Sequence, residues 1–170
     1  MAGTRAGHRY AIALGSNRAL SARLSPARLV EAAAGEIAAH GRVLARSPLV
    51  VTDPVGPSLR RYVNAALVLE SLLPPQAMLA ALQRIESALG RRRQRRWGAR
   101  TVDIDIILWS GGLWQGKALT IPHPAFRGRD FVLTPLAAVA PAWRDPLTGR
   151  SVRHLRHRLR KPRPKSRQGG

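Results

Sequence analysis

The stretch Thr101–Trp109 constrains the fold of this chain more than any other part of the sequence. It reads TVDIDIILW, so that Asp103 and Asp105 alternate with aliphatic residues. Successive side chains of a β-strand point to opposite faces, which places both carboxylates on one face with Thr101 and Ile107. The other face carries Val102, Ile104, Ile106 and Leu108. We therefore expect a sheet whose aliphatic face packs against helices and whose acidic face is open to ligands.

The segments before this stretch alternate between strand and helix patterns. Runs typical of strands occupy Arg9–Leu14, Arg42–Val51 and Tyr62–Leu69, and helical stripes begin at Ser25-Pro26 and Pro74-Pro75. Ser25 can cap the first helix, and Pro48 predicts an edge or a bulge within the second strand. The order strand-helix-strand-strand-helix-strand predicts an α+β fold, a ferredoxin-like split βαβ sandwich with an antiparallel sheet, helices on one face and an additional C-terminal layer.

The C-terminal third predicts smaller elements. Leu113–Ile121 is expected to form a hairpin and Phe131–Val139 a short helix. From Arg150 the chain is rich in arginine and ends in alternating basic residues, prolines and glycines. We predict a single domain over residues 1–149 and a disordered basic tail over residues 150–170, which can contact polyanions without specificity.

Composition limits the chemistry and the location of the protein. The chain has 170 residues and no cysteine, which excludes disulfides and thiolate metal sites. No apolar run has the length of a membrane span or of a signal-peptide core, so we expect a cytoplasmic protein. The net charge of +20 and the pI near 12.0 indicate an anionic partner. Charge alone does not distinguish among nucleic acid, a membrane surface and a nucleotide.

The two aspartates of the Thr101–Trp109 stretch suggest a metal site. Only nine residues of the chain are acidic, and these two lie two positions apart. Their backbones would be about 7 Å apart on one face of the strand. Two such carboxylates repel each other, and Mg²⁺ removes that repulsion and binds phosphate as well. The alternative is an exposed strand edge with two solvated aspartates.

A dense arginine segment precedes this strand. It carries Arg91, Arg92, Arg93, Arg95, Arg96 and Arg100. Guanidinium groups match the oxygens of phosphate, and phosphoryl transfer depends on positioning and charge neutralisation. The alternative is a solvated basic loop. Trp97 is an indole within this charged segment and suggests a flat ligand to cover.

Several side chains outside the segment could complete a nucleotide or heterocycle site. Tyr62 and Asn64 share one face of their strand, where the amide could bind a heterocycle edge or only a neighbouring strand. His123 lies between two prolines, in a stiff loop suited to contacting phosphate, although a lone loop histidine more often has a structural role. Arg127, Arg129 and Phe131 add further cations and a ring.

These motifs together resemble the 6-hydroxymethyl-7,8-dihydropterin pyrophosphokinase family. The resemblance extends from about Tyr10 to Pro141, and its most specific block is Arg96-Trp97-Gly98-Ala99-Arg100-Thr101-Val102-Asp103-Ile104-Asp105-Ile106-Ile107. Supporting blocks are Ala13-Leu14-Gly15-Ser16-Asn17, Tyr62-Val63-Asn64-Ala65-Ala66, Gln83-Arg84-Ile85-Glu86 and Ile121-Pro122-His123-Pro124.

The resemblance implies transfer of the pyrophosphoryl group of ATP to the hydroxymethyl group of a reduced pterin, with release of AMP. It implies that Asp103 and Asp105 hold two Mg²⁺ ions and that Arg91 and Arg100 are mobile catalytic arginines. The implied ATP contacts are Gln83, Glu86, Arg93, Arg96, His123 and Arg129. The implied pterin contacts are Thr52, Val55, Tyr62, Asn64, Trp97 and Phe131. We expect a monomer.

Two other classes of protein fit parts of the pattern. A two-metal nucleic-acid or nucleotidyl-transfer enzyme on a ferredoxin-like sheet would use the basic charge directly, but such sites usually need a further carboxylate. An RNA-binding module of similar topology would stack bases on sheet aromatics, which are scarce here. Neither class explains Asn64, Trp97 and His123 together.

Overall fold

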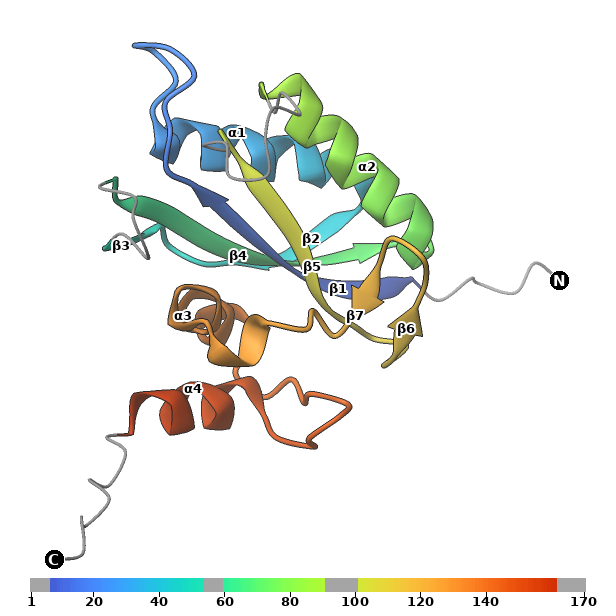
Figure 1. Cartoon of the computed structure of the whole chain (residues 1–170). Coiled ribbons are helices and arrows are strands. Elements are labelled where there is room, and N and C mark those ends of the chain that lie inside the picture. Colours follow the sequence, from blue (N-terminus) through green and yellow to red (C-terminus); the bar gives the residue numbers. More distant parts are fainter. Residues whose placement is uncertain (1–6, 54–59, 91–100, 162–170) are drawn as a thin grey trace, which may run out of the picture.

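A computed structural model of the chain describes residues 7–53, 60–90 and 101–161. It shows an antiparallel sheet in the order β2-β4-β1-β5, with β3 also pairing with β4 (Figure 1). The strands are β1 (His8–Ser16), β2 (Arg42–Arg46), β3 (Val50–Thr52), β4 (Tyr62–Ser71) and β5 (Asp103–Trp109). The predicted combination of helices with an antiparallel sheet is confirmed.

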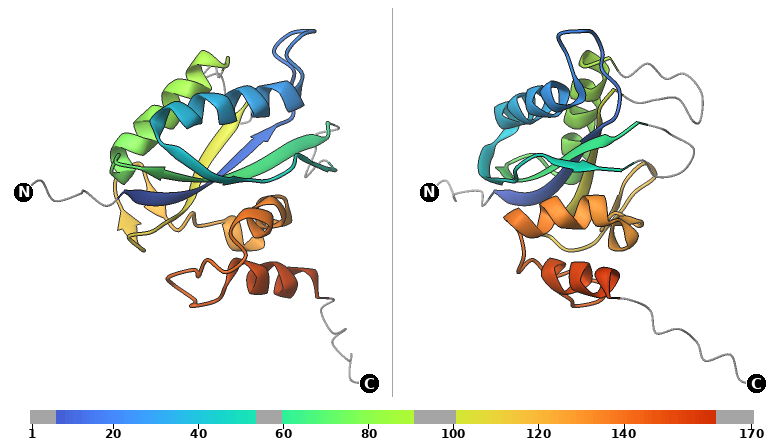
Figure 2. Two further views of the ribbon diagram at one scale, coloured as in Figure 1. Left: turned by 180° about the vertical axis from the view of Figure 1, so that it is seen from behind. Right: turned by 90° about the vertical axis from the view of Figure 1, so that its left-hand side faces the viewer.

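Helices cover both faces of this sheet. α1 (Pro26–Ile37) and α2 (Pro75–Ala88) lie on one face, and α3 (Asp130–Val139) lies on the other with α4 (Val152–Arg160) beyond it (Figures 1 and 2). Short 3₁₀ turns occupy η1 (Ala38–His40) and η2 (Phe126–Gly128). The predicted hairpin is confirmed as β6 (Trp114–Gln115) paired with β7 (Thr120–Ile121).

Local chemistry sets the ends of the helices and the break between β2 and β3. Ser25 Oγ accepts a hydrogen bond from the Arg28 backbone N–H, and Pro26 occupies the first helical turn, as predicted. The expected strand Arg42–Val51 is divided just before Pro48. There, Ser47 N–H bonds the Ala66 carbonyl at 2.8 Å, and Ser47 Oγ accepts from Ala66 N–H at 2.9 Å. The serine thereby bridges the gap that the proline creates.

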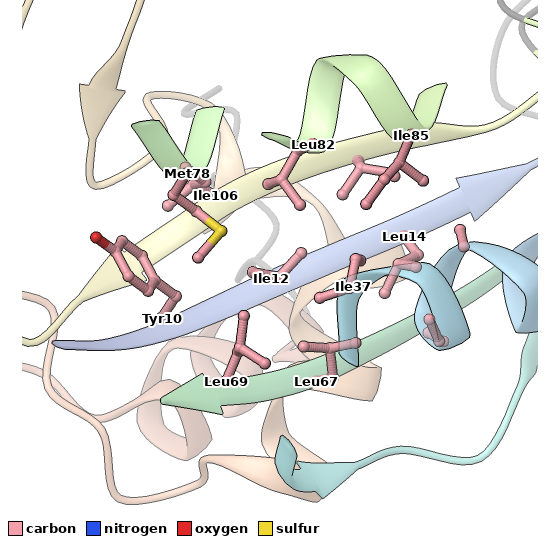
Figure 3. Close-up of a cluster of buried hydrophobic side chains, with 14 of the residues drawn as sticks. Tyr10, Ile12, Leu14, Ile37, Leu67, Leu69, Met78, Leu82, Ile85 and Ile106 are labelled. Atoms are coloured by element: carbon pink, nitrogen blue, oxygen red, sulfur yellow. The ribbon is translucent and has the colours of Figure 1, made fainter. Parts of the chain in front are cut away.

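The sheet separates two hydrophobic cores. The upper core lies beneath α1 and α2, where Ile12, Leu14 and Leu67 meet Leu82 and other apolar residues (Figure 3). The lower core lies on the opposite face, and there the central strands present the small residues Ala11, Ala13, Ala66 and Val68. Because these side chains are short, α3 packs close to the sheet with Leu133 and Leu136 fully buried.

The alternation predicted for β5 is confirmed over residues 102–106 and is wrong at Leu108. Val102, Ile104 and Ile106 belong to the upper core, but Ile107 and Leu108 both belong to the lower core. The pairing of β1 with β5 shifts by one residue, since Ala11 pairs with Leu108 whereas Ile12 pairs with Ile106. A β-bulge therefore places two consecutive side chains on the same face.

The prediction of disorder from Arg150 onward is wrong for α4. Ser151 Oγ caps this helix by accepting from His154 N–H. Val152 and Leu155 are spaced to share one helix face and are buried in the lower core. Burial of that face stabilises the helix despite its many charges. Residues 162–170 lie outside the described residues, among which no helix is long and apolar enough to cross a membrane.

Candidate active site

Asp103 and Asp105 project from the lower face of β5 beside a patch without large side chains. On β1, Gly15 pairs with Asn64 on one side and with Asp103 on the other. Two residues earlier on β1, Ala13 pairs with Asp105. A Cβ atom on Gly15 would lie 3.1 Å from Asn64 Oδ1. The backbone of β1 thus forms an open floor between the amide and the aspartates.

Asn64 lies on the far side of this floor in a fixed orientation. Its side chain is only 3% exposed, and Nδ2 donates a hydrogen bond to Thr52 Oγ1 at 2.9 Å. Thr52 pairs with Tyr62 across β3 and β4. The structure therefore brings together three of the predicted pterin contacts. Because Nδ2 is engaged by Thr52, the amide oxygen is the group directed toward Gly15.

His123 lies beside Asp105 at the outer edge of β5. Its Nε2 is 3.9 Å from Asp105 Oδ2, beyond direct hydrogen-bond distance. The His123 backbone N–H donates to the Ile107 carbonyl at 3.0 Å, and Nδ1 accepts from Ala125 N–H at 3.2 Å. When the ring is neutral, the proton consequently resides on Nε2, which faces the aspartate.

Glu86 approaches the same edge from α2. It is 2% exposed, and its Oε1 accepts a hydrogen bond from the Ile104 backbone N–H at 2.8 Å. Ile104 lies between the two aspartates, so this carboxylate secures the part of β5 that carries them. The sequence did not predict this contact, although the period of α2 gives a signal, because Glu86 lies four residues after the buried Leu82 and so shares its helix face. Gln83, predicted to act with Glu86, is exposed on the helix surface.

The segment around α3 contributes a cation and a ring. Arg129 lies just before Asp130, with its Cζ 5.8 Å from the centre of the Phe131 ring. Arg127, by contrast, is bound to Asp145, with both nitrogen–oxygen distances at 2.7 Å. The structure thus separates two arginines that are alike in the sequence. Each lies near a phenylalanine ring, with the Arg127 Cζ 4.8 Å from the centre of Phe126, but only Arg127 is also held by a buried carboxylate.

Six predicted site residues lie outside the described residues, namely Val55, Arg91, Arg93, Arg96, Trp97 and Arg100. The positions that flank the arginine segment are described. Gly90 ends α2 with a positive φ of 91°, and Ser16 Oγ donates a hydrogen bond to the Thr101 carbonyl. The segment therefore rejoins the sheet at the end of β1, two residues before Asp103.

The acidic side chains of the site suit a divalent metal that protein encloses only in part. Among the residues that the structure describes, no group of three or more His, Cys, Asp or Glu side chains could enclose an ion. Mg²⁺ does not need such a cage, because it retains several waters and binds through one or two carboxylates together with phosphate oxygens. The pair Asp103 and Asp105 fits a magnesium ion that arrives with a polyphosphate.

A known protein family matches most of this chain. Residues 11–141 match the family model described as 7,8-dihydro-6-hydroxymethylpterin-pyrophosphokinase (HPPK). The chain belongs to the HPPK family. The matched range runs from within β1 to beyond the end of α3 and contains every described site residue, whereas α4 follows it.

Curated HPPK relatives cover most of this chain. The 2-amino-4-hydroxy-6-hydroxymethyldihydropteridine pyrophosphokinase of Pseudomonas aeruginosa is 43% identical over 141 residues, which are 81% of this chain and 84% of the relative. The enzyme of the same name from Haemophilus influenzae is 39% identical over 132 residues, or 76% and 79% of the two chains. The family predicted from the motifs is confirmed.

Solved structures agree at the level of the fold. The wild-type HPPK-DHPS chain of Plasmodium falciparum, solved with SDX-DHP, has a TM-score of 0.70 and 14% sequence identity. The alignment covers 89% of this chain and 44% of that chain. At this identity the likeness concerns the fold alone, and the present chain spans less than half of that larger protein.

Proposed function

We propose that this protein transfers the pyrophosphoryl group of ATP to the hydroxymethyl group of 6-hydroxymethyl-7,8-dihydropterin, a step of folate biosynthesis. The observation that carries the proposal is the placement of Asp103 and Asp105 opposite Asn64, across the open floor at Gly15. A charged metal–polyphosphate fits one side of this floor, and a heterocycle fits the other. Family membership and the curated relatives support the same reaction.

On the acidic side, Asp103 and Asp105 would hold two magnesium ions. These ions would neutralise the triphosphate and orient its phosphorus atoms for attack. His123 presents Nε2 toward this side and can donate a hydrogen bond to a phosphate oxygen. Arg129 contributes a positive charge on the same side. Further proposed contacts of ATP are Gln83, Arg93 and Arg96.

On the opposite side, the Asn64 amide would bind the polar edge of the pterin. The hydrogen bond from Nδ2 to Thr52 fixes the orientation in which the amide oxygen accepts from the ligand. Tyr62 and Phe131 would pack around the ring, together with Trp97 and the loop residue Val55. The hydroxymethyl oxygen then faces the triphosphate, which is the arrangement that a direct transfer requires.

The transfer itself joins the hydroxymethyl oxygen to the β-phosphorus of ATP. The bond from that phosphorus to the oxygen bridging to the α-phosphate breaks, the hydroxyl proton leaves, and AMP departs. Arg91 and Arg100 are proposed to stabilise the charge that spreads over the transferred group.

The identity of the nucleotide product tests this function. We expect magnesium-dependent release of AMP when ATP and the reduced pterin alcohol are both supplied, with a pterin diphosphate formed in equal amount. Chromatographic separation of the nucleotides distinguishes this result from release of ADP. Formation of ADP, or AMP release that does not depend on the pterin, would contradict the proposal.

We also propose a topology, an oligomeric state and a role for the basic C-terminal residues. The strand order β2-β4-β1-β5 supports a ferredoxin-like split βαβ arrangement. We also propose that the protein is a monomer, which sedimentation can test. The basic residues Arg163, Lys165 and Arg167 are proposed to contact polyanions, and their replacement by glutamine should lower the salt concentration that elutes the protein from heparin.

A further inference from the structure

We propose that the C-terminal segment positions Arg129 and Phe131 for substrate binding, through two arginine–aspartate contacts that flank these residues. The inference rests on the proposed function, since it gives that site a support beyond residues 11–141, the range of the family match. The two contacts are Arg127–Asp145 and Asp130–Arg160.

The first contact fixes the chain just before Arg129. Asp145 is fully buried and accepts from Arg127 Nε and Nη2, both at 2.7 Å. It also accepts from Thr148 Oγ1 at 2.6 Å and from the Leu147 backbone N–H at 3.1 Å. A carboxylate with this many donors is held in one position. Arg127 is thereby anchored, and η2 with it.

The second contact fixes the chain just after Arg129. Arg160 Nε lies 2.9 Å from Asp130 Oδ1, and Arg160 Nη2 lies 2.8 Å from Asp130 Oδ2, a bidentate pair. Thr134 Oγ1 donates to Asp130 Oδ1 and accepts from Arg160 Nη2 and Arg156 Nε, at distances between 3.1 and 3.2 Å. The network ties the first turn of α3 to α4.

Helix geometry and helix dipoles both favour this second contact. Asp130 and Thr134 are four residues apart on α3, and Arg156 and Arg160 are four residues apart on α4, so each pair forms one face of its helix. The carboxylate lies at the N-terminus of α3 and the guanidinium at the C-terminus of α4, where the helix dipoles favour these charges. The two helices lie side by side in every view (Figures 1 and 2).

Arg129 lies between the two anchored positions with its own charge available. Among residues 7–53, 60–90 and 101–161, no carboxylate lies within ion-pair distance of its guanidinium, which instead lies near the Phe131 ring. Fixing both neighbours while leaving this cation for a ligand is the arrangement expected of a preorganised anion contact. Arg127 and Arg160 are accordingly positioning residues, and Arg129 is the residue that binds.

The test compares Arg160→Gln with Arg158→Gln in the full chain. Both arginines are exposed and lie in the last turn of α4, but no bond of Arg158 to the described residues is found. We expect Arg160→Gln to raise KM for ATP or the pterin about two- to threefold with little change in kcat, as for loss of a partly exposed bidentate pair. Arg158→Gln should leave KM unchanged.

Two further variants separate positioning from stability. Asp130→Asn should raise KM as Arg160→Gln does, and the double variant should resemble either single variant, because both remove the same contact. Thermal unfolding is measured in parallel. Equal KM values for Arg160→Gln and Arg158→Gln would overturn the inference, as would a lower Tm of Arg160→Gln with unchanged KM. Absence of AMP release by the unmodified protein would instead contradict the proposed function.

Discussion

The carboxylates of β5 and those of the C-terminal layer are the same chemical group in opposite settings. Asp145 is fully buried and holds Arg127 at 2.7 Å, whereas the side chain of Asp105 is 35% exposed and lies 3.9 Å from His123. Asp145 accepts hydrogen bonds from three neighbouring residues that belong to its own layer. The first arrangement stabilises the fold, and the second is suited to a ligand that brings its own positive charge.

The comparison shows that proximity of aspartate and arginine in a sequence does not assign a role. The stretch from Arg91 to Asp105 and the segment from Arg127 to Arg160 are both rich in arginine, and each contains two aspartates. Burial decides whether an aspartate stabilises the fold or binds a ligand. A buried carboxylate requires fixed hydrogen-bond donors, whereas a partly exposed one remains accessible to a metal ion. Substitutions of the β5 aspartates should therefore lower activity, whereas substitutions of the C-terminal aspartates should lower stability.

The largest effect is expected for Asp103→Asn and Asp105→Asn. Each should lower kcat roughly 100- to 1,000-fold, the usual result of losing one preorganised electrostatic contact. The Tm should stay close to that of the unmodified protein, since both side chains are partly exposed and solvent screens their charges. The AMP assay and thermal unfolding measure the two quantities, and Glu31→Gln on the exposed surface of α1 is the control. Loss of folding in both variants would show that Asp103 and Asp105 stabilise the fold, as Asp145 does, and would contradict the difference between the two sets of carboxylates.

A complementary result is expected for Asp145→Asn. Removing this charge leaves Arg127 with fewer acceptors and should lower the free energy of unfolding by about 2–3 kcal/mol, with the Tm falling by about 5 °C. Asp130→Asn, which breaks a more exposed pair, should cost only about 0.5 kcal/mol. Urea unfolding measures both. Equal losses in the two variants would show that burial does not set the difference.

The pH dependence of stability sharpens the same point. Burial alone would raise the pKa of Asp145, but hydrogen bonds from Arg127, Thr148 and Leu147 outweigh it and lower the pKa to about 2 from 3.8. Because the folded-state pKa is lowered, the stabilisation is present above about pH 4 and is lost as the pH falls toward 2. Its size is about 2 kcal/mol. Unfolding of the unmodified protein and of Asp145→Asn should converge over that interval. A difference that persists unchanged at pH 2 would contradict the assignment.

The most local effect concerns Glu86, a buried carboxylate that accepts a hydrogen bond from β5. Glu86→Gln keeps an acceptor for Ile104 N–H, whereas Glu86→Ala removes it at a cost of about 1–2 kcal/mol. We expect hydrogen exchange at the Ile104 amide to quicken roughly tenfold in the alanine variant and little in the glutamine variant. Equal exchange in both variants would show that the hydrogen bond does not secure the strand.

The position of the site could be predicted from the sequence because strand alternation is a local property. Asp103 and Asp105 share a face with each other, and Tyr62 and Asn64 share a face of β4, as their spacing requires. The partnership of Asn64 with Thr52 could not be predicted, because it depends on the register between β3 and β4. The register is set by the break at Ser47 and Pro48, which belongs to the tertiary structure.

The C-terminal layer was predicted less well, for a physical reason. Composition after Arg150 is typical of disorder, yet Val152 and Leu155 bury one helix face against the lower core. Few apolar residues suffice when a formed core is already present, and the charges that dominate the composition lie outside it or bind Asp130. The resemblance assigned Glu86 to ATP binding, and the helix period can indicate its burial. The hydrogen bond that its carboxylate accepts from the Ile104 backbone N–H could not be predicted, because a backbone partner leaves no mark in the sequence.

The β-bulge at Ile107 and Leu108 divides β5 into two parts with different tasks. Before the bulge, alternate residues set the direction of the aspartates, and after it the side chains serve the packing of α3. The two parts meet at Ile107, whose side chain is buried in the lower core while its carbonyl accepts a hydrogen bond from the His123 N–H. A change of packing beneath α3 can therefore reach the site through the backbone of one residue.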